Sequence, residues 1–371
     1  MMILKRCFKV ASFLFLFAFC LTSCINSVSQ KGKYLMIYST DMFHPPSDPD
    51  DHYDWAMLNK LGEIEVKAFI FDLGSWTRNA DEVAVTALKQ ISFITGKDIP
   101  PYALGLSTKM VSLDDQALDQ PEKYQKGVDL ILQTLRNSQE QVILFLVGSC
   151  RDFAAAFNRD PELLQQKVKA VYINAGNGND EIQRELNVEM DPLAYEILLK
   201  SGLPVYWCPC FGKTHKTFYI VENQEEILSS CKKEMKNFFA YALNKSTDDP
   251  IHYVSGEEQK IPATKRNMWC TGPFIHASGR KIYQESDGKY IACTLAVAKQ
   301  KGISDKEVEV FRFEKVKLTF APEYTEENDL PIIPSIRVDL NAAESNIQSF
   351  RYVHPEYNQI MTSVLSSLLS E

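Results

Sequence analysis

Five continuous apolar runs, separated by segments with helical periodicity, constrain the fold of this chain more than any other feature. Most of the runs are rich in β-branched or aromatic residues, which is typical of strands buried on both faces of a parallel sheet. They cover residues 34–38, 68–71, 142–147, 170–173 and 205–208. Helix candidates between them include residues 81–95, 121–137, 192–200 and 224–243. This alternation predicts an α/β fold with an open, mostly parallel sheet flanked by helices.

The alternation fades after Asn244, so residues 244–371 form a C-terminal elaboration. Residues 308–319 resemble a β-hairpin, and residues 322–334 read as a Pro- and acid-rich loop. A final apolar stripe at helical spacing predicts an amphipathic helix that packs on the core. Its members are Tyr357, Ile360, Met361, Val364, Leu365 and Leu368.

The first 24 residues have the features of a targeting signal. Lys5, Arg6 and Lys9 precede an apolar stretch over residues 10–21, which is too short for a comfortable membrane span. It ends in Leu-Thr-Ser-Cys24, which resembles a bacterial lipobox. We therefore expect a lipoprotein signal peptide (1–23), acyl chains such as palmitate on Cys24, a tether (24–33) and a folded domain (34–371). This places the protein in the cell envelope, on the periplasmic or surface face, and the alternatives are a plain secretory signal or an uncleaved anchor.

Charge and cysteine usage narrow the function classes. The 371 residues carry 48 Asp and Glu against 40 Lys and Arg, a net charge of -8, which argues against binding of nucleic acid. The six cysteines beyond Cys24 lack paired C-x-x-C spacing, so we expect buried free thiols and no zinc site. A disulfide in an exported protein is the alternative.

An acidic cluster follows the first apolar run. Asp41 comes directly after it, and Asp48, Asp50 and Asp51 precede a helical segment. Ligands of open α/β sheets bind at the carboxyl ends of the strands. Four neighbouring carboxylates repel one another, and a hard cation such as Ca²⁺ or Mg²⁺ relieves that repulsion. The alternative is a solvated acidic loop in which Asp51 caps the helix.

The stretch from Ser39 through Asp41 to Asp50 and Asp51 resembles the N-terminal signature of the nucleoside hydrolase family, Asp-x-Asp-x-x-x-Asp-Asp. The resemblance implies that Asp41 is the general base and a Ca²⁺ ligand, and that Asp50 and Asp51 serve the metal and the ribose. Two departures are visible. Ser39 replaces the first Asp of the signature, and residues 43–47 lengthen the loop.

Two downstream segments extend the resemblance. Residues 145–156 are similar to the family's strand followed by Gly-Pro-Leu-Thr-Asn-x-Ala, which implies that the Val147 carbonyl binds the metal. The alternative is a turn that needs Gly148 for a positive φ. Residues 178–194 match Gly-Asn…Glu-Phe-Asn…Asp-Pro-Glu-Ala, which implies that Asn179, Glu185 and Asn187 bind ribose hydroxyls. The alternative there is a polar turn, with Asp191 capping the next helix.

The resemblance thins after Cys210. The family's late His-Asp-Pro segment supplies a leaving-group acid and another metal ligand, and Gly272 stands where that Asp would be. His276 is either a displaced acid or a structural histidine. His276, Trp76 and Trp269 are the candidates for contact with the base.

The chain is thus identified as a divergent member of the inosine-uridine preferring nucleoside hydrolase superfamily. The resemblance implies hydrolysis of the N-glycosidic bond of a ribonucleoside or related pentoside by metal-activated water, with Ca²⁺ as cofactor and Asp41 as base. One alternative is a non-catalytic lipoprotein that binds a sugar or nucleoside, and another is an enzyme with a changed leaving group. Relatives are often dimers or tetramers, so a homo-oligomer is compatible with the resemblance.

Overall fold

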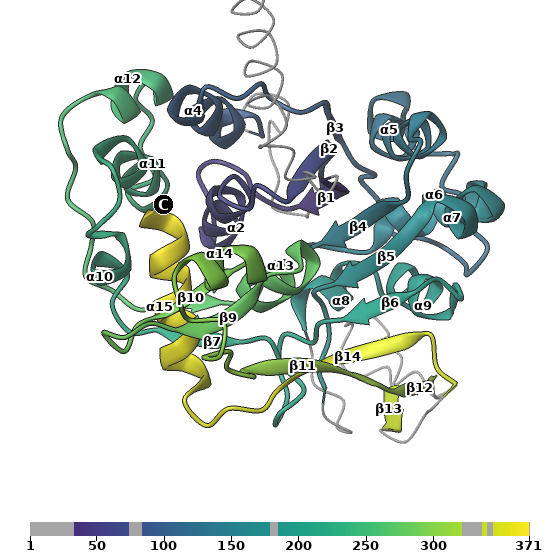
Figure 1. Ribbon diagram of the computed structural model, residues 1–371. Coiled ribbons are helices and arrows are strands. Elements are labelled where there is room, and N and C mark those ends of the chain that lie inside the picture. The colour runs from purple at the N-terminus through teal and green to yellow at the C-terminus, as the bar shows by residue number, and fades with distance from the viewer. Residues whose placement is uncertain (1–32, 74–83, 179–184, 321–335, 340–343, 371) are drawn as a thin grey trace, which may run out of the picture. The chain divides into compact units, whose positions relative to one another are not determined.

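An eight-stranded sheet forms the centre of the computed structural model, which describes residues 33–73, 84–178, 185–320, 336–339 and 344–370 (Figure 1). The strand order is β11-β14-β6-β5-β4-β1-β2-β3, and all neighbours are parallel except β11 and β14. The strands are β1 (Tyr34–Thr40), β2 (Ile64–Phe71), β3 (Tyr102–Leu104), β4 (Val142–Leu146), β5 (Val168–Ile173), β6 (Val205–Trp207), β11 (Phe311–Lys315) and β14 (Ile347–Tyr352). The predicted α/β class is therefore confirmed.

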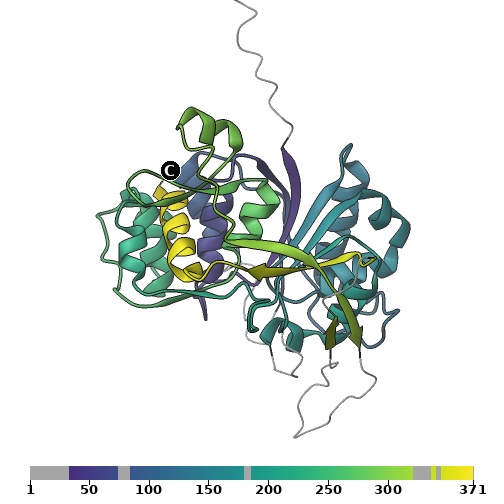
Figure 2. The same ribbon diagram turned by 60° about the horizontal axis from the view of Figure 1, so that its bottom comes forward.

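Helices cover both faces of this sheet (Figure 2). One face carries α5 (Glu122–Asn137), α6 (Arg151–Arg159), α7 (Pro161–Lys167) and α9 (Pro192–Lys200). The other carries α2 (Asp50–Leu58), α4 (Thr86–Thr95), α10 (Gln224–Leu228), α11 (Lys233–Leu243), α13 (Thr271–Ser278) and α15 (Tyr357–Ser370). Three further described helices are α8 (Leu186–Met190), α12 (Pro250–Ser255) and α14 (Leu295–Gln300). Three two-stranded sheets complete the described elements. They are β7 (Tyr219–Val221) with β8 (Arg266–Met268), β9 (Lys281–Gln284) with β10 (Tyr290–Cys293), and β12 (Lys317–Phe320) with β13 (Ile336–Asp339).

The central strands are apolar throughout because both of their faces are buried. Along β1, Met36 and Tyr38 pack in the core beneath α2 and α15, whereas Ile37 points into the core beneath α5 and α6. The same alternation continues in β2, β4 and β5. Burial on both faces explains why these segments read as continuous apolar runs.

The order of the strands places a crevice next to β1. The chain moves from β1 to β2 and β3 on one side, and β4 then returns to the other side of β1. The connections after β1 and β4 therefore leave the sheet in opposite directions, and ligands bind at such switch points. Asp41 and Val147 both lie at this position in the chain.

Two predicted elements were wrong. Residues 224–243 form two helices, α10 and α11, because the chain breaks at residues 229–232. There the Ser229 hydroxyl donates to the Glu226 carbonyl at 2.8 Å and the Cys231 thiol turns inward toward the Leu369 carbonyl. Serine hydroxyls compete in this way with helical hydrogen bonds.

Residues 308–319 do not form a hairpin. β11 adds to β14 at the edge of the main sheet, whereas β12 pairs with β13. Val316 lies between β11 and β12, is fully buried, and donates its N–H to the Ile347 carbonyl at 3.0 Å. The loop expected at 322–334 lies outside the described residues.

The closing helix and the cysteines match their predictions. The six predicted core positions of α15 are at most 4% exposed. The six cysteines from Cys150 to Cys293 are buried thiols, and none forms a disulfide within the described part of the chain. The expected signal peptide and Cys24 lie outside the described residues, within which no helix is both long and apolar enough to cross a bilayer. Tyr34–Glu371 form one compact unit, and the division at residue 244 stays a prediction.

Candidate active site

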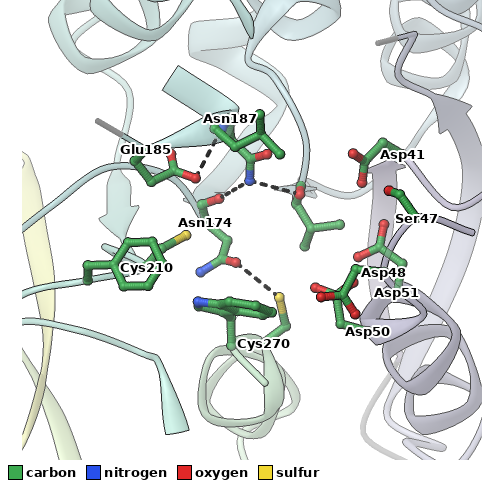
Figure 3. A pocket seen from close by; sticks show the side chains of 14 residues that line it. Asp41, Ser47, Asp48, Asp50, Asp51, Asn174, Glu185, Asn187, Cys210 and Cys270 are labelled. Carbon is green, nitrogen blue, oxygen red and sulfur yellow. Dashed lines mark hydrogen bonds between the residues drawn. The ribbon is translucent and has the colours of Figure 1, made fainter. Parts of the chain in front are cut away.

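A cavity of about 270 Å³ opens at the carboxyl ends of the central strands (Figure 3). It brings together seven of the site residues predicted from the sequence, which come from three separate segments of the chain. They are Asp41, Asp48, Asp50, Asp51, Val147, Glu185 and Asn187. Trp269, a predicted candidate for contact with the base, also lines the cavity, and the remaining lining residues are Ser47, Asn174, Leu186, Cys210, Phe211 and Cys270.

Carboxylates form one wall of the cavity. Asp41 directly follows β1, and Asp50 and Asp51 occupy the first turn of α2. The Thr40 hydroxyl donates a short hydrogen bond to Asp51, which fixes the start of α2 against the end of β1. Figure 3 shows these carboxylates with Asp48 along one side, facing Glu185 and Asn187 across the cavity.

The carboxylates of this wall disfavour one another's ionisation. Burial, and then the charge of Asp72, raises the pKa of Asp41 to about 7. Burial also raises the pKa values of Asp50 and Asp51 well above the ordinary range, with further contributions from Asp48 at Asp50 and from Asp50 at Asp51. A cation at this wall would relieve the repulsion.

The donor set suits a hard cation. Carboxylate oxygens of Asp41, Asp50 and Asp51, together with a backbone carbonyl, are the ligands that Ca²⁺ prefers. In the part of the chain that the structure describes, no group of three His, Cys, Asp or Glu side chains is arranged to hold a metal ion as it stands. The fit therefore rests on the chemistry of the donors and on their raised pKa values.

Asp72 and Gly148 lie directly behind this wall. Asp72 is fully buried and accepts hydrogen bonds from the Ser149 N–H at 2.6 Å and the Ser149 hydroxyl at 2.7 Å. A Cβ on Gly148 would lie 2.5 Å from the Asp72 Oδ2 atom. Gly148 does not have a positive φ, so the alternative explanation for this glycine was wrong. The glycine is required because the Asp72 carboxylate approaches its backbone.

The opposite wall is built from Glu185 and Asn187. Glu185 caps α8 and accepts backbone N–H groups of Asn187 at 3.0 Å, Val188 at 3.1 Å and Gly176 at 2.8 Å. The Asn187 side-chain amide donates to the carbonyls of Val147 at 3.0 Å and Asn174 at 2.9 Å. Its amide oxygen accepts no hydrogen bond from the described residues, so it can accept one from a hydroxyl.

The sequence did not single out Asn174, Cys210, Phe211 or Cys270. Asn174 directly follows β5, so the rule that identified Asp41 would also have found it. Its side-chain amide donates to the Cys208 carbonyl at 3.0 Å, and its oxygen accepts from the Cys270 thiol at 3.3 Å. Cys210 and Phe211 lie in the loop after β6, and only tertiary structure brings them to the cavity.

Aromatic side chains border the cavity beside these residues. Phe211 is 38% exposed, and its ring lies edge-on to that of Trp269 with 6.5 Å between centroids. Phe218 supports Trp269 with a centroid distance of 5.6 Å. The indole Nε1 atom of Trp269 is buried and has no hydrogen-bond partner among the described residues. This edge of the cavity therefore offers flat apolar surface.

Several predicted residues lie elsewhere. His276 is on α13, with Nδ1 2.7 Å from the Tyr172 hydroxyl and its ring 4.4 Å from that of Phe313, and it does not line the cavity. Burial lowers the pKa of His276 to about 4. Gly272 packs on Phe350, whereas Cys270, which precedes α13, reaches the cavity.

Asp191 caps α9 through the Ala194 N–H at 3.1 Å, as its alternative role predicted. Asn179 and Trp76 lie outside the described residues.

Known proteins resemble this chain over most of its length. The family model described as inosine-uridine preferring nucleoside hydrolase matches residues 36–270. The pyrimidine-specific ribonucleoside hydrolase RihA of Escherichia coli O1:K1 is 28% identical over 271 residues, which cover 66% of this chain and 84% of that protein. RihA of Escherichia coli strain K12 is 27% identical over the same shares.

A solved structure shows the same fold. The inosine-uridine preferring nucleoside hydrolase from Bacillus anthracis superposes with a TM-score of 0.52 at 12% identity, covering 90% of this chain and 99% of that one. The matched family segment runs from β1 to Cys270 and so includes every cavity residue named above. The chain therefore belongs to the nucleoside hydrolase family, whose members are hydrolases acting on N-glycosyl compounds.

Proposed function

We propose that this protein hydrolyses the N-glycosidic bond of a ribonucleoside or related pentoside. One observation carries the proposal: the cavity holds Asp41, Asp50 and Asp51 on one wall and Glu185 and Asn187 on the other (Figure 3). A volume of about 270 Å³ is close to the lower end of the range for small-molecule sites. The ligand is therefore one small molecule.

The carboxylate wall activates water in this proposal. Asp41, Asp50, Asp51 and the Val147 carbonyl would hold Ca²⁺, which lowers the pKa of a water molecule when bound. Asp41 accepts the proton of the attacking water. It directly follows a rigid strand and remains partly exposed to the cavity, which suits a base that must meet water.

The opposite wall holds the sugar. Three backbone N–H groups fix the Glu185 carboxylate, and two carbonyls fix the Asn187 amide, so neither group has to reorganise when the sugar hydroxyls arrive. Asn179 is assigned to the same hydroxyls on the strength of the family pattern. Positive charge that develops on the pentose as the bond breaks is stabilised by the surrounding carboxylates.

The leaving group faces the aromatic edge. Phe211 and Trp269 offer a flat apolar surface against which a planar base can stack. No His or Lys is among the described residues that line the cavity. We infer that the base leaves without a histidine acid.

The proposed location, the bacterial cell envelope, follows from the expected lipoprotein signal peptide. Lipidation of Cys24 would hold the protein at the membrane of a bacterial envelope, because acyl chains partition durably into a bilayer. Cys24→Ala should then move the protein from the membrane fraction to the soluble fraction. A membrane-bound Cys24→Ala protein would contradict the lipid anchor.

The test is turnover by the full chain. Inosine, uridine and p-nitrophenyl riboside are each incubated with the protein and Ca²⁺, with Asp41→Asn as the matched variant. We expect hydrolysis by the wild type and a loss of about 100-fold or more in the variant. Ribose binding without turnover in the wild type would refute the enzyme and support a non-catalytic binding lipoprotein. Asp51→Ala should also abolish the heat of Ca²⁺ binding in a calorimetric titration.

A further inference from the structure

One cavity carboxylate differs from the others because it already has a cationic partner. The Arg266 guanidinium donates through Nη1 to the Asp48 Oδ1 atom at 2.8 Å. The other acidic residues that line the cavity form no ion pair within the described part of the chain. Asp48 is thus the one member of the carboxylate wall whose charge is balanced in the described structure.

The backbone of Arg266 is fixed by strand pairing. Arg266 is the first residue of β8 and pairs with Val221 of β7, and its side chain is only 17% exposed. The segment before it is fixed by Gln224, whose amide donates to the Pro262 carbonyl at 3.1 Å. Arg266 therefore reaches Asp48 from a paired strand, with most of its side chain covered.

Asp48 lies close to the proposed cation ligands. Figure 3 shows it on the same side of the cavity as Asp41, Asp50 and Asp51. The Asp48 side chain is 44% exposed and lines the same cavity. The loop before it is anchored by His44, whose Nε2 atom lies 2.6 Å from the Ser246 carbonyl. A carboxylate here borders the proposed cation site.

We propose that Arg266 withholds Asp48 from the cation, so that the cation meets three carboxylates and competes with Arg266 for a fourth. The inference rests on the proposed cation site. Fewer carboxylate ligands leave coordination positions for water and sugar oxygens, and the number of charged ligands sets the affinity of a Ca²⁺ site. Arg266 is a positioning residue in this account, since it acts through Asp48.

Removing the charge of Arg266 and removing the charge of Asp48 should therefore have opposite effects on the affinity for Ca²⁺. Without the guanidinium, Asp48 is an unpaired carboxylate beside the site, so Ca²⁺ should bind more tightly. Without the Asp48 charge, the guanidinium is uncompensated and repels the cation, so Ca²⁺ should bind more weakly. A pair that only joined the loop to β8 would weaken binding whichever partner was removed.

The experiment is calorimetric titration of the full chain with Ca²⁺, with thermal melts of every variant. We expect Arg266→Met to lower the Kd about fivefold or more and Asp48→Asn to raise it by a similar factor. Arg266→Lys keeps the charge and should stay within about twofold of the wild type. Lys236→Met breaks a remote pair of similar burial, Lys236 with Glu258 at 2.9 Å, and should leave the Kd unchanged.

The outcomes separate this inference from the proposed function. If the wild type binds Ca²⁺ but both Arg266→Met and Asp48→Asn weaken binding, or neither changes it more than about twofold, withholding of Asp48 is refuted and the cation site stands. If the wild type binds no Ca²⁺, the cation role falls and this inference falls with it. Asp48 is at the surface, so Asp48→Asn keeps the test decisive if Arg266→Met does not fold.

Discussion

Replacing Gly148 by alanine should force the Asp72 carboxylate away from the backbone behind the cavity. The new Cβ would lie 2.5 Å from the Asp72 Oδ2 atom and 3.2 Å from its Cβ and Cγ atoms. To reach ordinary contact, the carboxylate must move by about 1 Å. That movement would lengthen its hydrogen bonds to the Ser149 N–H and hydroxyl, now 2.6 and 2.7 Å.

The magnitude follows from two effects. Overpacking a buried site costs about 1–3 kcal/mol, and a weakened hydrogen bond to a buried carboxylate adds to that cost. We expect Gly148→Ala to lower the free energy of unfolding by about 2–4 kcal/mol, measured by urea denaturation.

Gly62→Ala is the matched control, because a Cβ there has nothing within 4 Å and the glycine has no positive φ. It should change the free energy of unfolding by less than about 1 kcal/mol. If Gly148→Ala were as stable as this control, the close approach of Asp72 would not be the reason for the glycine.

Three further predictions test residues outside the proposed chemistry. Arg151→Met should lower the free energy of unfolding by about 3–5 kcal/mol in urea denaturation, because Arg151 and Asp191 form a buried ion pair at 3.2 Å; a loss under 1 kcal/mol would contradict this. Burial and then the charge of Asp72 raise the pKa of Asp152 to about 7 against an ordinary 3.8, so the native state binds more protons than the unfolded state between these values. The wild type should then lose up to about 1.4 kcal/mol per pH unit relative to Asp152→Asn as pH rises from 4 to 7, and parallel stability curves would refute the raised pKa. His276→Gln should keep kcat/KM within about threefold, whereas a loss above about 100-fold would restore His276 as the leaving-group acid.

Much of the fold was predictable because its signal is local. The five apolar runs became β1, β2, β4, β5 and β6, since strands buried on both faces must be apolar throughout. β3 and β14 were missed, because a three-residue strand is too short to show a period and the sequence of β14, IQSFRY, does not alternate regularly. Two other features depend on contacts between distant parts of the chain, which no local pattern encodes. The break between α10 and α11 involves a contact with Leu369. At Val316, which contacts Ile347, the chain leaves β11, paired with β14, and enters β12, paired with β13.

Part of the candidate site was also predictable from the sequence. Asp41 and Val147 follow buried strands, so the strand-end rule places them together. Glu185 and Asn187 came from a family pattern, and their contacts show that they are fixed by backbone groups. Phe211 and Cys270 reach the cavity through loops whose paths depend on tertiary packing, so their sequence context gave no signal.

Release of free pentose from uridine or inosine, followed in one sample as Ca²⁺ is chelated and then restored, tests the central claim most directly. We expect turnover by the wild-type chain to stop on chelation and to return with Ca²⁺, and the Asp41→Asn chain to stay about 100-fold or more below the wild type at every stage. Turnover that continues through chelation, or that survives in Asp41→Asn, would contradict a cation-assisted hydrolysis in which Asp41 is the base.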